Sequence, residues 1–495
     1  MRSEQPQEPP QPDLGADGLP EQAGIIVMKF GGSSVADAER MTEVAALVAQ
    51  APGTPLVVLS ATARTTDTLF GAARQAERGD LGAALDLQRN LLGRHRGIAQ
   101  ELFPAGLPAA LDQALAGLGD ELDLLLRGVA MLRELSARSM DAIASIGERL
   151  STRILAAHLG AAWVDARSVL RTDDGFGGAR PQPGAIAALA ARHLAPQLAP
   201  GRPVVTQGYI GATAEGLTTT LGRGGSDYSA ALFGAALGAT DIQIWTDVEG
   251  VLTCDPRVVP QARPIARLSF KEAAELAAFG AKVLHPATIQ PAMAAGIPVT
   301  VRSTRQPRGH FTTITAEAHT GRAITPLAQR GPVSVLTIST GELACQDGFQ
   351  AMADLFQVFS RHHVSVDLVA TAEASVSLAV DPGAPLEALL RDLEGLGTAV
   401  AVARDRTIVA VVGEQLRFTP GVTGRCFAAL KAINVELISM GANEINLSFV
   451  VRQEDAGGAL RALHTALIES PARRRDGLAK GPLPSWPRAS LAHVC

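Results

Sequence analysis

The chain has 495 residues, of which 47% are hydrophobic and 19% charged, and its formal net charge is -5. A chain of this length exceeds what one hydrophobic core usually holds, so two to four domains are expected. The modest charge and the 4% aromatic content argue against a nucleic-acid or membrane partner. The four cysteines show no CxxC pair and no apolar leader precedes residue 24, which together predict a cytoplasmic protein.

Residues 24 to about 315 alternate between strand-like and helix-like patterns, after a proline-rich segment, 1–23, that we expect to be disordered. Most of the sequence between 71 and 160 is helical by pattern. The alternation predicts an α/β domain with a mostly parallel sheet that helices cover on both faces. The expected strands are 24–30, 56–60, 162–165, 203–207, 241–247 and 297–302.

Two glycine-rich turns each connect a predicted strand to a helix. Lys29 stands at the exit of the first strand, and Gly31-Gly32-Ser33-Ser34 follows it. The second turn, Leu221-Gly-Arg-Gly-Gly-Ser-Asp227, contains one cation, Arg223, and one carboxylate, Asp227. Glycine removes the Cβ clash, so backbone N–H groups are free to face an anion, and the helix N-terminus adds positive charge. Each turn, taken alone, is equally compatible with an ordinary surface connection.

Polar residues follow two other predicted strands. Ser60 and Thr66 come after the strand 56–60, and Thr246-Asp247 ends the strand 241–247. Open α/β sheets bind ligands at the carboxyl ends of their strands, so these residues are candidates for a binding crevice. Their alternative role is the ordinary one of capping helices and forming turns.

Two further charged residues are candidates on weaker grounds. Gly147-Glu148 is expected to open a helix over 143–159, where a glutamate ordinarily only supports the helix dipole. Lys282 lies in a glycine-containing connection between two predicted helices. It is one of only five lysines in a chain that otherwise uses arginine, which marks it as a site where a compact cation is needed.

The last third of the chain contains an internal repeat. Each copy has a strand, a helix and two further strands, which predicts two ferredoxin-like βαββαβ modules, at 330–402 and 403–470. Such a pair either senses a small ligand at a shared interface or serves only to dimerise the protein. Residues 471–495 are expected to form a disordered tail. The repeated strands and helices are 333–338, 352–359, 364–369 and 376–380 in the first copy, and 407–412, 426–432, 435–438 and 445–450 in the second.

Four separated segments resemble one family, the aspartate kinases, in sequence and in order. The resemblance covers about residues 24 to 470 and is closest to the lysine-sensitive monofunctional class with tandem ACT modules. It implies an α/β fold in which an amino-acid-kinase αβα sandwich, residues 24–315, precedes the two ACT modules. The segments are Lys29-Phe-Gly-Gly-Ser-Ser34, Leu221-Gly-Arg-Gly-Gly-Ser-Asp227, Trp245-Thr-Asp247 with Asp255-Pro-Arg257, and Gly280-Ala-Lys-Val-Leu-His-Pro286.

The resemblance also implies a reaction, in which ATP with Mg²⁺ phosphorylates the side-chain carboxylate of L-aspartate. It assigns Lys29 and Asp227 to catalysis, with Asp227 orienting either Lys29 or the substrate amine. Glu148 is implied to bind the α-amine and Arg223 the α-carboxylate. The other implied substrate residues are Ser60, Thr66 and Ser226, and the implied nucleotide residues are Lys29, Gly31, Gly32, Ser33, Thr246, Asp247, Arg257 and Lys282.

The chemistry agrees with these assignments. A free aspartate side chain has a pKa near 4 and is ionised at neutral pH, so it needs no general base. The barrier is the approach of two anions, which cations and backbone N–H groups lower. Mg²⁺ usually binds through the phosphates, and no carboxylate cluster in the sequence indicates a dedicated metal site.

The effector site and the adenine site depart from the family pattern. The segment resembling the lysine-binding site contains Ser365, Asp367, Thr371 and Glu373, and the loop 345–353 before it is about two residues longer. Leu252 stands where the family often has a tyrosine near the adenine. The resemblance of this segment still favours lysine over threonine as effector, and we expect a homodimer or larger assembly through the ACT modules. There are two alternatives: another kinase of the same fold, or a non-catalytic amino-acid sensor. Glu148 argues against a kinase that acts on an N-blocked amino acid, because a blocked amine would not need this carboxylate.

Overall fold

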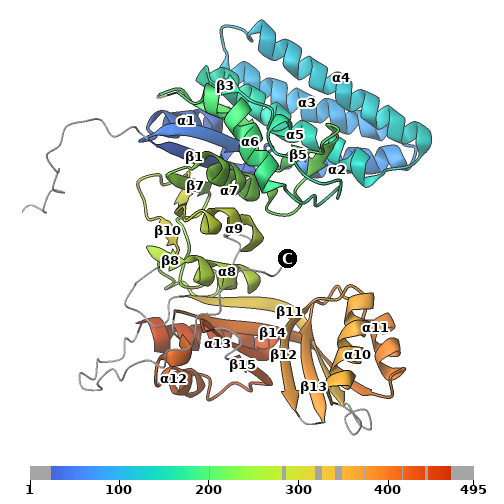
Figure 1. The fold of residues 1–495 in the computed structure, drawn as a ribbon, viewed down its shortest axis with the longest axis vertical. Helices are drawn as coiled ribbons and strands as arrows, with labels where there is room; N and C mark the ends of the chain where they lie inside the picture. The colour runs from blue at the N-terminus through green and yellow to red at the C-terminus, as the bar shows by residue number, and fades with distance from the viewer. Residues whose placement is uncertain are drawn as a thin grey trace, which may run out of the picture. The chain divides into compact units, whose positions relative to one another are not determined.

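The computed structural model describes residues 24–199, 201–280, 286–317, 326–339, 348–372, 374–414, 416–440 and 444–469. They form two compact units (Figure 1). The first unit contains residues up to 256 together with 261–329 and 412–414, and the second contains 257–260, 330–411 and the chain from 415 onward. The two predicted tails, 1–23 and 471–495, lie outside the described residues.

The first unit is built on an eight-stranded sheet with the order β3-β4-β2-β1-β7-β9-β10-β8. Its neighbouring strands pair in parallel, apart from the antiparallel pair β9–β10, so the prediction of a mostly parallel sheet is confirmed. A separate antiparallel hairpin joins β5 (Ile210–Ala212) to β6 (Thr218–Thr220). The sheet strands are β1 (Ile25–Phe30), β2 (Thr54–Leu59), β3 (Ala162–Trp163), β4 (Val204–Gln207), β7 (Asp241–Thr246), β8 (Arg267–Ser269), β9 (Val299–Ser303) and β10 (Thr312–Thr315).

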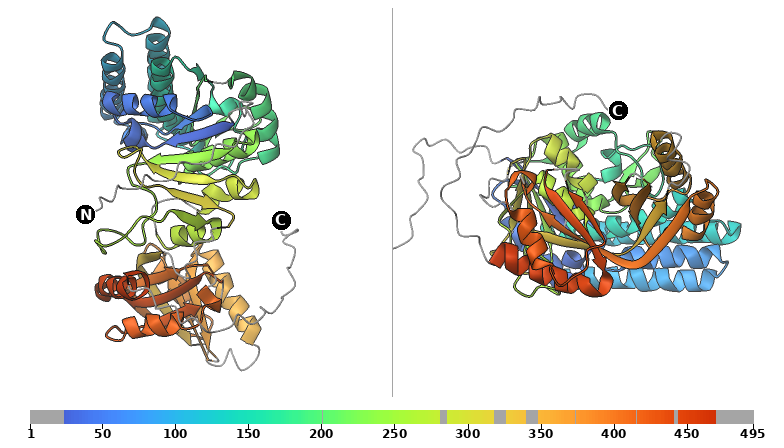
Figure 2. Two further views of the ribbon diagram at one scale, coloured as in Figure 1. Left: turned by 90° about the vertical axis from the view of Figure 1, so that its left-hand side faces the viewer. Right: turned by 90° about the horizontal axis from the view of Figure 1, so that it is seen from below.

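Helices cover both faces of this sheet (Figures 1 and 2). The alternation of strand side chains explains why: Met28 and Phe30 of β1 pack into the core formed with α1 to α5, whereas Val27 points to the other face. There Gly234 of α7 faces the sheet, and a Cβ on it would lie 2.5 Å from Ile242 Cδ1 and 3.7 Å from Val27 Cγ2. The helices are α1 (Ala38–Ala49), α2 (Thr65–Glu77), α3 (Leu81–Leu102), α4 (Ala109–Leu132), α5 (Ala137–Leu159), α6 (Pro183–His193), α7 (Gly225–Leu237), α8 (Phe270–Ala278) and α9 (Pro286–Ala294).

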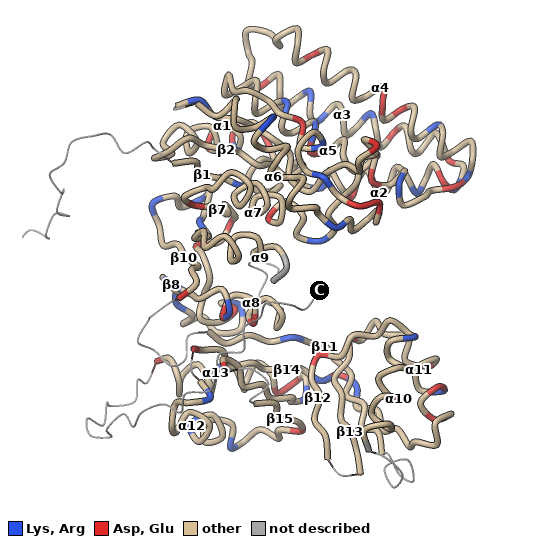
Figure 3. Tube along the Cα trace, in the orientation of Figure 1, with Lys and Arg blue, Asp and Glu red and all other residues tan. Residues whose placement is uncertain are grey.

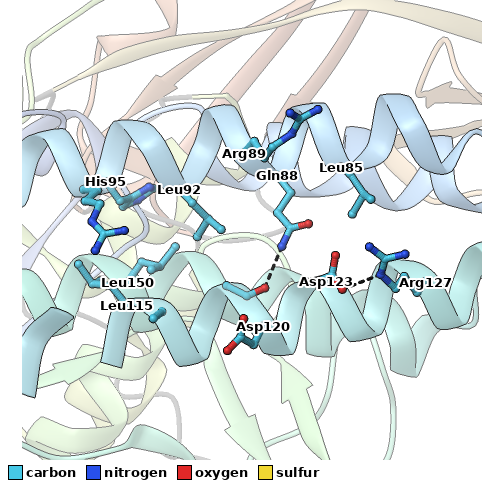
Figure 4. Close-up of a pocket in the computed structure, with 13 residues that line it drawn as sticks. Leu85, Gln88, Arg89, Leu92, His95, Leu115, Asp120, Asp123, Arg127 and Leu150 are labelled. Atoms are coloured by element: carbon cyan, nitrogen blue, oxygen red, sulfur yellow. Dashed lines mark hydrogen bonds and ion pairs between the residues drawn. The ribbon is translucent and has the colours of Figure 1, made fainter. Parts of the chain in front are cut away.

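The helical region predicted between 71 and 160 is confirmed as α2 to α5. The long helices α3 and α4 pack against each other, and a cleft of about 480 Å³ lies along them (Figure 4). The Gln88 side-chain amide of α3 donates a hydrogen bond to the Gly119 carbonyl of α4 at 2.8 Å. A Cβ at position 119 would lie 2.9 Å from Leu92 Cδ1, so a larger residue there would displace the end of the Leu92 side chain.

The second unit contains the predicted repeat. Its six-stranded sheet has the order β12-β13-β11-β14-β16-β15, and the strand pairs described within it are antiparallel, as the expected modules require (Figure 2). Helices α10 and α11 pack on the first copy through a buried cluster that includes Leu355, Phe359 and Leu389. The elements are β11 (Leu327–Ser339), α10 (Gly348–Arg361), β12 (Val366–Ala372), β13 (Ser375–Val380), α11 (Leu386–Glu394), β14 (Ala399–Val412), α12 (Val422–Ala429), β15 (Leu437–Met440), β16 (Asn446–Arg452) and α13 (Gln453–His464).

Charge is distributed rather than concentrated. Basic and acidic residues are interspersed along the described parts of both units (Figure 3). Among the described helices, none has the length and apolar character needed to cross a bilayer.

Candidate active site

The sheet register brings the predicted strand-exit residues to one edge. Phe30 of β1 pairs with Leu59 of β2 on one side and with Trp245 of β7 on the other. Because these strands are parallel, the residues that follow each of them emerge at the same carboxyl edge. Lys29, Ser60 and Thr246 therefore start from neighbouring positions, as the strand-end argument predicts.

A cavity of about 630 Å³ opens at this edge, a size suited to a small molecule. It collects residues that are far apart in the sequence and come from β1, the β2–α2 connection, α5 and the start of α7. All of the predicted catalytic and substrate residues line it. They are Lys29, Ser60, Thr66, Glu148, Arg223, Ser226 and Asp227, and the predicted phosphate residue Gly32 lines it as well.

Two contacts join β1 and β2 to the glycine loop before α7. Lys29 Nζ forms an ion pair with Asp227 Oδ1 at 2.7 Å, and the Ser60 hydroxyl donates to Ser226 Oγ at 3.0 Å. Of the two roles left open for Asp227, the structure therefore shows contact with Lys29. The loop reaches this position because Gly224, which precedes α7, has a left-handed φ of 72°, a conformation that glycine adopts without strain.

The position predicted for Glu148 within its helix is wrong. The helix α5 begins at Ala137, with Ser136 as N-cap, so Glu148 lies in its middle rather than in its first turn. The misleading signal is Gly147, which suggested a helix start. Its actual role is close packing, since a Cβ there would lie 2.9 Å from Ala61 Cβ and 2.8 Å from Thr65 Cγ2.

Glu148 lies in the part of α5 that packs against the β2–α2 connection, and it is buried there. The side chain is 3% exposed, and Oε1 accepts a hydrogen bond from the Ala61 N–H at 3.2 Å. Its other oxygen, Oε2, is buried and has no hydrogen-bond partner within the described part of the chain. Burial raises the pKa of this carboxyl from 4.5 to about 8, although the Ala61 hydrogen bond lowers it. An unpaired, perturbed carboxyl facing a cavity is suited to bind a cation.

Some cavity residues have no counterpart among the predicted site residues. Asp141 precedes Glu148 by seven residues on the same helix, a spacing that places both on one face and could have signalled it. Tyr209 and Arg64 both line the cavity with left-handed backbone, at φ values of 68° and 64°, which is unusual for non-glycine residues. Burial raises the pKa of the Tyr209 hydroxyl above its ordinary value of 10.

The cleft between α3 and α4 is a different site. None of the predicted residues lines it, and Asp123 and Arg127 of its lining form an ion pair with each other (Figure 4). It meets the active-site region at His95, whose Nε2 lies 3.1 Å from the Thr62 hydroxyl. Burial lowers the pKa of His95 to about 4, so this histidine is neutral at physiological pH and acts as a hydrogen-bonding strut.

Only some of the predicted nucleotide residues, Lys29 and Gly32, line the cavity. Gly31 lies beside the cavity, where a Cβ would be 3.6 Å from Lys29 Nζ, and Ser33 is exposed in the short turn that follows. Thr246 and Asp247 lie at the exit of β7 but do not line the cavity. The remaining predictions are not tested by the geometry. Arg257 is exposed and belongs to the second unit, and Lys282 lies outside the described residues.

The first glycine loop offers a test of backbone proximity. A Cβ on Gly32 would lie 2.7 Å from the Ala61 carbonyl oxygen, so Gly32→Ala has to push two backbone segments apart. We expect a loss of roughly 1–3 kcal/mol in unfolding free energy and a clear fall in kcat/KM for the nucleotide. Gly31→Ala is the matched control, because its Cβ makes only an ordinary contact and the backbone N–H is kept. Equal thermal stability and activity in the two variants would contradict this account of the loop.

Comparison with known proteins agrees with this fold and site. Residues 24–303 match the amino acid kinase family, and residues 409–467 match an ACT domain. The family match covers more than half of the chain and defines its class as that of the amino acid kinases. The chain is 39% identical over 463 residues to the lysine-sensitive aspartokinase 3 of Escherichia coli (strain K12), covering 90% of this chain and 99% of that protein.

Two solved structures of E. coli aspartokinase III are similar over the same extent. The complex with aspartate and ADP has a TM-score of 0.76 and 40% identity, and the complex with lysine and aspartate has a TM-score of 0.75 and 38% identity. Both comparisons cover 90% of this chain and 99% of the other. This chain belongs to the aspartokinase family.

Proposed function

We propose that this protein transfers the γ-phosphoryl group of ATP to the side-chain carboxylate of L-aspartate, giving 4-phospho-L-aspartate. This is the first step of the biosynthesis of lysine, threonine and methionine. The observation that carries the proposal is a single cavity lined by Lys29, Arg223 and Glu148, which are two cations and one buried carboxyl. A ligand with two carboxylates, one ammonium and a phosphate donor beside it matches this distribution of charge.

In this proposal each charged group has one task. Arg223 binds the α-carboxylate through its planar guanidinium, and Glu148 binds the α-ammonium through Oε2. Lys29, held by Asp227, neutralises the phosphates, with backbone N–H groups of Gly31 and Gly32 beside it. The aspartate side chain is already ionised and attacks without a general base.

We also propose ATP and Mg²⁺ as the nucleotide and its metal ion. No group of three or more His, Cys, Asp or Glu side chains suited to a metal occurs in the part of the chain that the structure describes. In this proposal the ion would be held mainly by the phosphates and would supply charge neutralisation. Thr246 and Asp247 at the β7 exit, together with Arg257 and Lys282, are the proposed nucleotide residues, and Leu252 is the apolar residue proposed near the adenine.

An assay that traps the acyl phosphate with hydroxylamine tests the proposal. With ATP and Mg²⁺, L-aspartate should give hydroxamate, whereas N-acetyl-L-aspartate should not, because its blocked amine leaves Glu148 without a partner. Turnover of the blocked substrate at a similar rate would favour the alternative of another kinase of this fold. No product from either compound would favour the non-catalytic sensor.

Arg223 is the residue that should control affinity for aspartate. Arg223→Ala removes the bidentate donor, so the KM for L-aspartate should rise by about 30-fold or more, while the KM for ATP changes little. Arg192→Ala, at an exposed position of α6 away from the cavity, is the control and should behave as wild type. Steady-state kinetics measure both, and an unchanged KM for aspartate would remove Arg223 from the substrate site.

We propose that L-lysine inhibits the enzyme by binding the first ACT module near Asp367. This residue lies in a β-bulge of β12, and its Oδ1 pairs with Arg330 at 2.8 Å. Its other oxygen, Oδ2, is buried without a hydrogen-bond partner among the described residues, and burial raises the pKa of the carboxyl. Such an oxygen can accept an ammonium group. Ser365 and Thr371 are exposed beside it, and Glu373 lies outside the described residues.

Replacing Asp367 should therefore relieve inhibition. In Asp367→Ala the lysine concentration for half-inhibition should rise about tenfold or more, since one charge-assisted contact is worth about 1.5–3 kcal/mol. Asp381→Asn is the control. Asp381 is exposed, and its contact with Arg330 is longer, at 3.6 Å, than that of Asp367. The measurement is activity against increasing lysine concentration, and inhibition that persists in Asp367→Ala would place the effector elsewhere.

We further propose a cytoplasmic homodimer or larger assembly joined through the ACT modules.

A further inference from the structure

One buried carboxylate of the cavity has no task in the chemistry proposed above. Asp141 lies two helical turns before Glu148, so the two side chains leave the same face of α5. Both line the cavity, and Asp141 is 2% exposed. Because burying a carboxylate is costly unless it is hydrogen-bonded, the groups that bond to it show what it holds in place.

Both oxygens of Asp141 are used, and they bond to two other segments. Oδ2 accepts hydrogen bonds from the backbone N–H groups of Gly177 and Thr220, each at 2.9 Å. Oδ1 accepts a third from the Thr220 hydroxyl at 2.8 Å. Gly177 lies in the connection before α6, and Thr220 is the last residue of β6. One carboxylate of α5 therefore ties together segments that are 36 and 79 residues away from it.

The held segments support the glycine loop that carries Arg223. Thr220 directly precedes this loop, and its carbonyl accepts a hydrogen bond from the Ala179 N–H at 2.9 Å. A Cβ on Gly222 would lie only 3.2 Å from the Gly177 carbonyl oxygen. The loop thus rests on the same two segments that Asp141 fixes, and its position relative to α5 depends on this carboxylate.

We propose that Asp141 is a positioning residue for the amino-acid substrate, because it sets the loop of Arg223 against the helix of Glu148. This inference rests on the proposed function, in which Arg223 binds the α-carboxylate and Glu148 the α-amine. Those two groups of aspartate are bonded to one carbon atom, so the two side chains have to keep a fixed separation. A displacement of about 1 Å at such a site costs up to about 100-fold.

Kinetics of full-length variants test the proposal. Asp141→Asn keeps the size of the side chain but removes the negative charge and leaves a single acceptor oxygen for the N–H groups and the hydroxyl that bond to it. The KM for L-aspartate should rise about 10- to 100-fold, whereas the KM for ATP and kcat at saturating aspartate should change less than about threefold. Thr220→Val removes the hydroxyl, which bonds to Asp141 and to the Tyr209 side chain, but keeps the backbone N–H, and it should raise the KM for aspartate about 2- to 10-fold. Thr220→Ser keeps the hydroxyl and should restore it.

Asp165→Asn is the matched control, because Asp165 is a carboxylate of the same unit that pairs with Arg167 and does not line the cavity. An unchanged KM for aspartate in both Asp141→Asn and Thr220→Val would overturn the proposal. An equal loss in kcat and in both KM values would also overturn it, since that is the sign of a general structural defect. If Asp141→Asn does not fold, the two Thr220 variants decide. Failure of the proposed function is distinguishable from failure of this inference, because in the first case the wild-type protein would form no aspartyl hydroxamate.

Discussion

Replacing Lys29 with methionine should lower kcat about 100- to 1000-fold, the usual cost of removing one preorganised donor from a developing anion. Lys29 lies at the end of β1, 12% exposed, with Asp227 at 2.7 Å. Methionine keeps the length of the side chain but leaves the phosphates without this cation and Asp227 without its partner. The measurement is kcat from hydroxamate formation at saturating ATP and aspartate, with thermal unfolding as a check on folding.

Two further variants make the Lys29 experiment specific. Lys29→Arg keeps the charge but not the compact ammonium, and it should recover only part of the rate. Lys431→Met removes a lysine of the second unit, outside the cavity, and should leave kcat unchanged. A Lys29→Met enzyme that keeps most of its kcat while remaining folded would contradict the phosphate role of this residue.

Glu148→Gln should raise the KM for L-aspartate by about 30-fold or more, because it removes one partner of a buried charge pair. The amide oxygen can still accept the hydrogen bond that Ala61 donates to Glu148, so the fold should be kept. Glutamine resembles the protonated glutamic acid in size, and what it lacks is the ability to ionise when the substrate ammonium arrives. Steady-state kinetics and titration calorimetry with aspartate measure the change. An unchanged affinity would exclude Glu148 from the amine site.

The raised pKa of Glu148 adds a pH signature with a definite sign. With a pKa of about 8, only a minority of free enzyme carries the carboxylate at pH 7. The kcat/KM for aspartate should therefore rise roughly fivefold to tenfold between pH 7 and 8.5, since this ratio reports the free enzyme. Tyr209 titrates at higher pH, because burial raises its pKa above 10. Glu148→Gln should abolish the rise, and a rise that persists in that variant would assign it to another group.

The same pKa makes Glu148 costly to stability at high pH. The native carboxyl holds its proton more tightly than the unfolded one, whose pKa is 4.5, so stability is lost as pH rises from about 4.5 through 8. Glu148→Gln should therefore melt at a higher temperature than wild type at pH 9 and at nearly the same temperature at pH 5. A binding residue that destabilises its own protein is expected at a functional site.

Local sequence signals predicted the strands and the turns that follow them, whereas the roles of the residues in those turns came from the family resemblance. Lys29 at the end of β1 and the glycine turn before α7 both follow from glycine, helix-start and strand patterns, and the parallel sheet brings them to one edge. The repeat in the second unit was likewise readable from its spacing. Those signals cannot predict how deeply a side chain is buried, because burial depends on segments that are remote in the chain.

Glu148 and Asp141 illustrate that limit. The pKa of Glu148 depends on its burial and on the hydrogen bond from Ala61, which is 87 residues away, and no motif around Glu148 indicates either. Asp141 bonds to Thr220 across 79 residues, and none of the four motifs in the sequence contains it. Both become visible only when α5 is seen against β6 and the β2–α2 connection.

The most direct test of the account is a crystal structure of this protein with L-aspartate and ADP bound. The account predicts the α-carboxylate of aspartate on Arg223, its ammonium at Glu148 Oε2, and its side-chain carboxylate turned toward Lys29 and the nucleotide phosphates. Aspartate bound with its side chain away from residue 29, or in another cavity altogether, would contradict it.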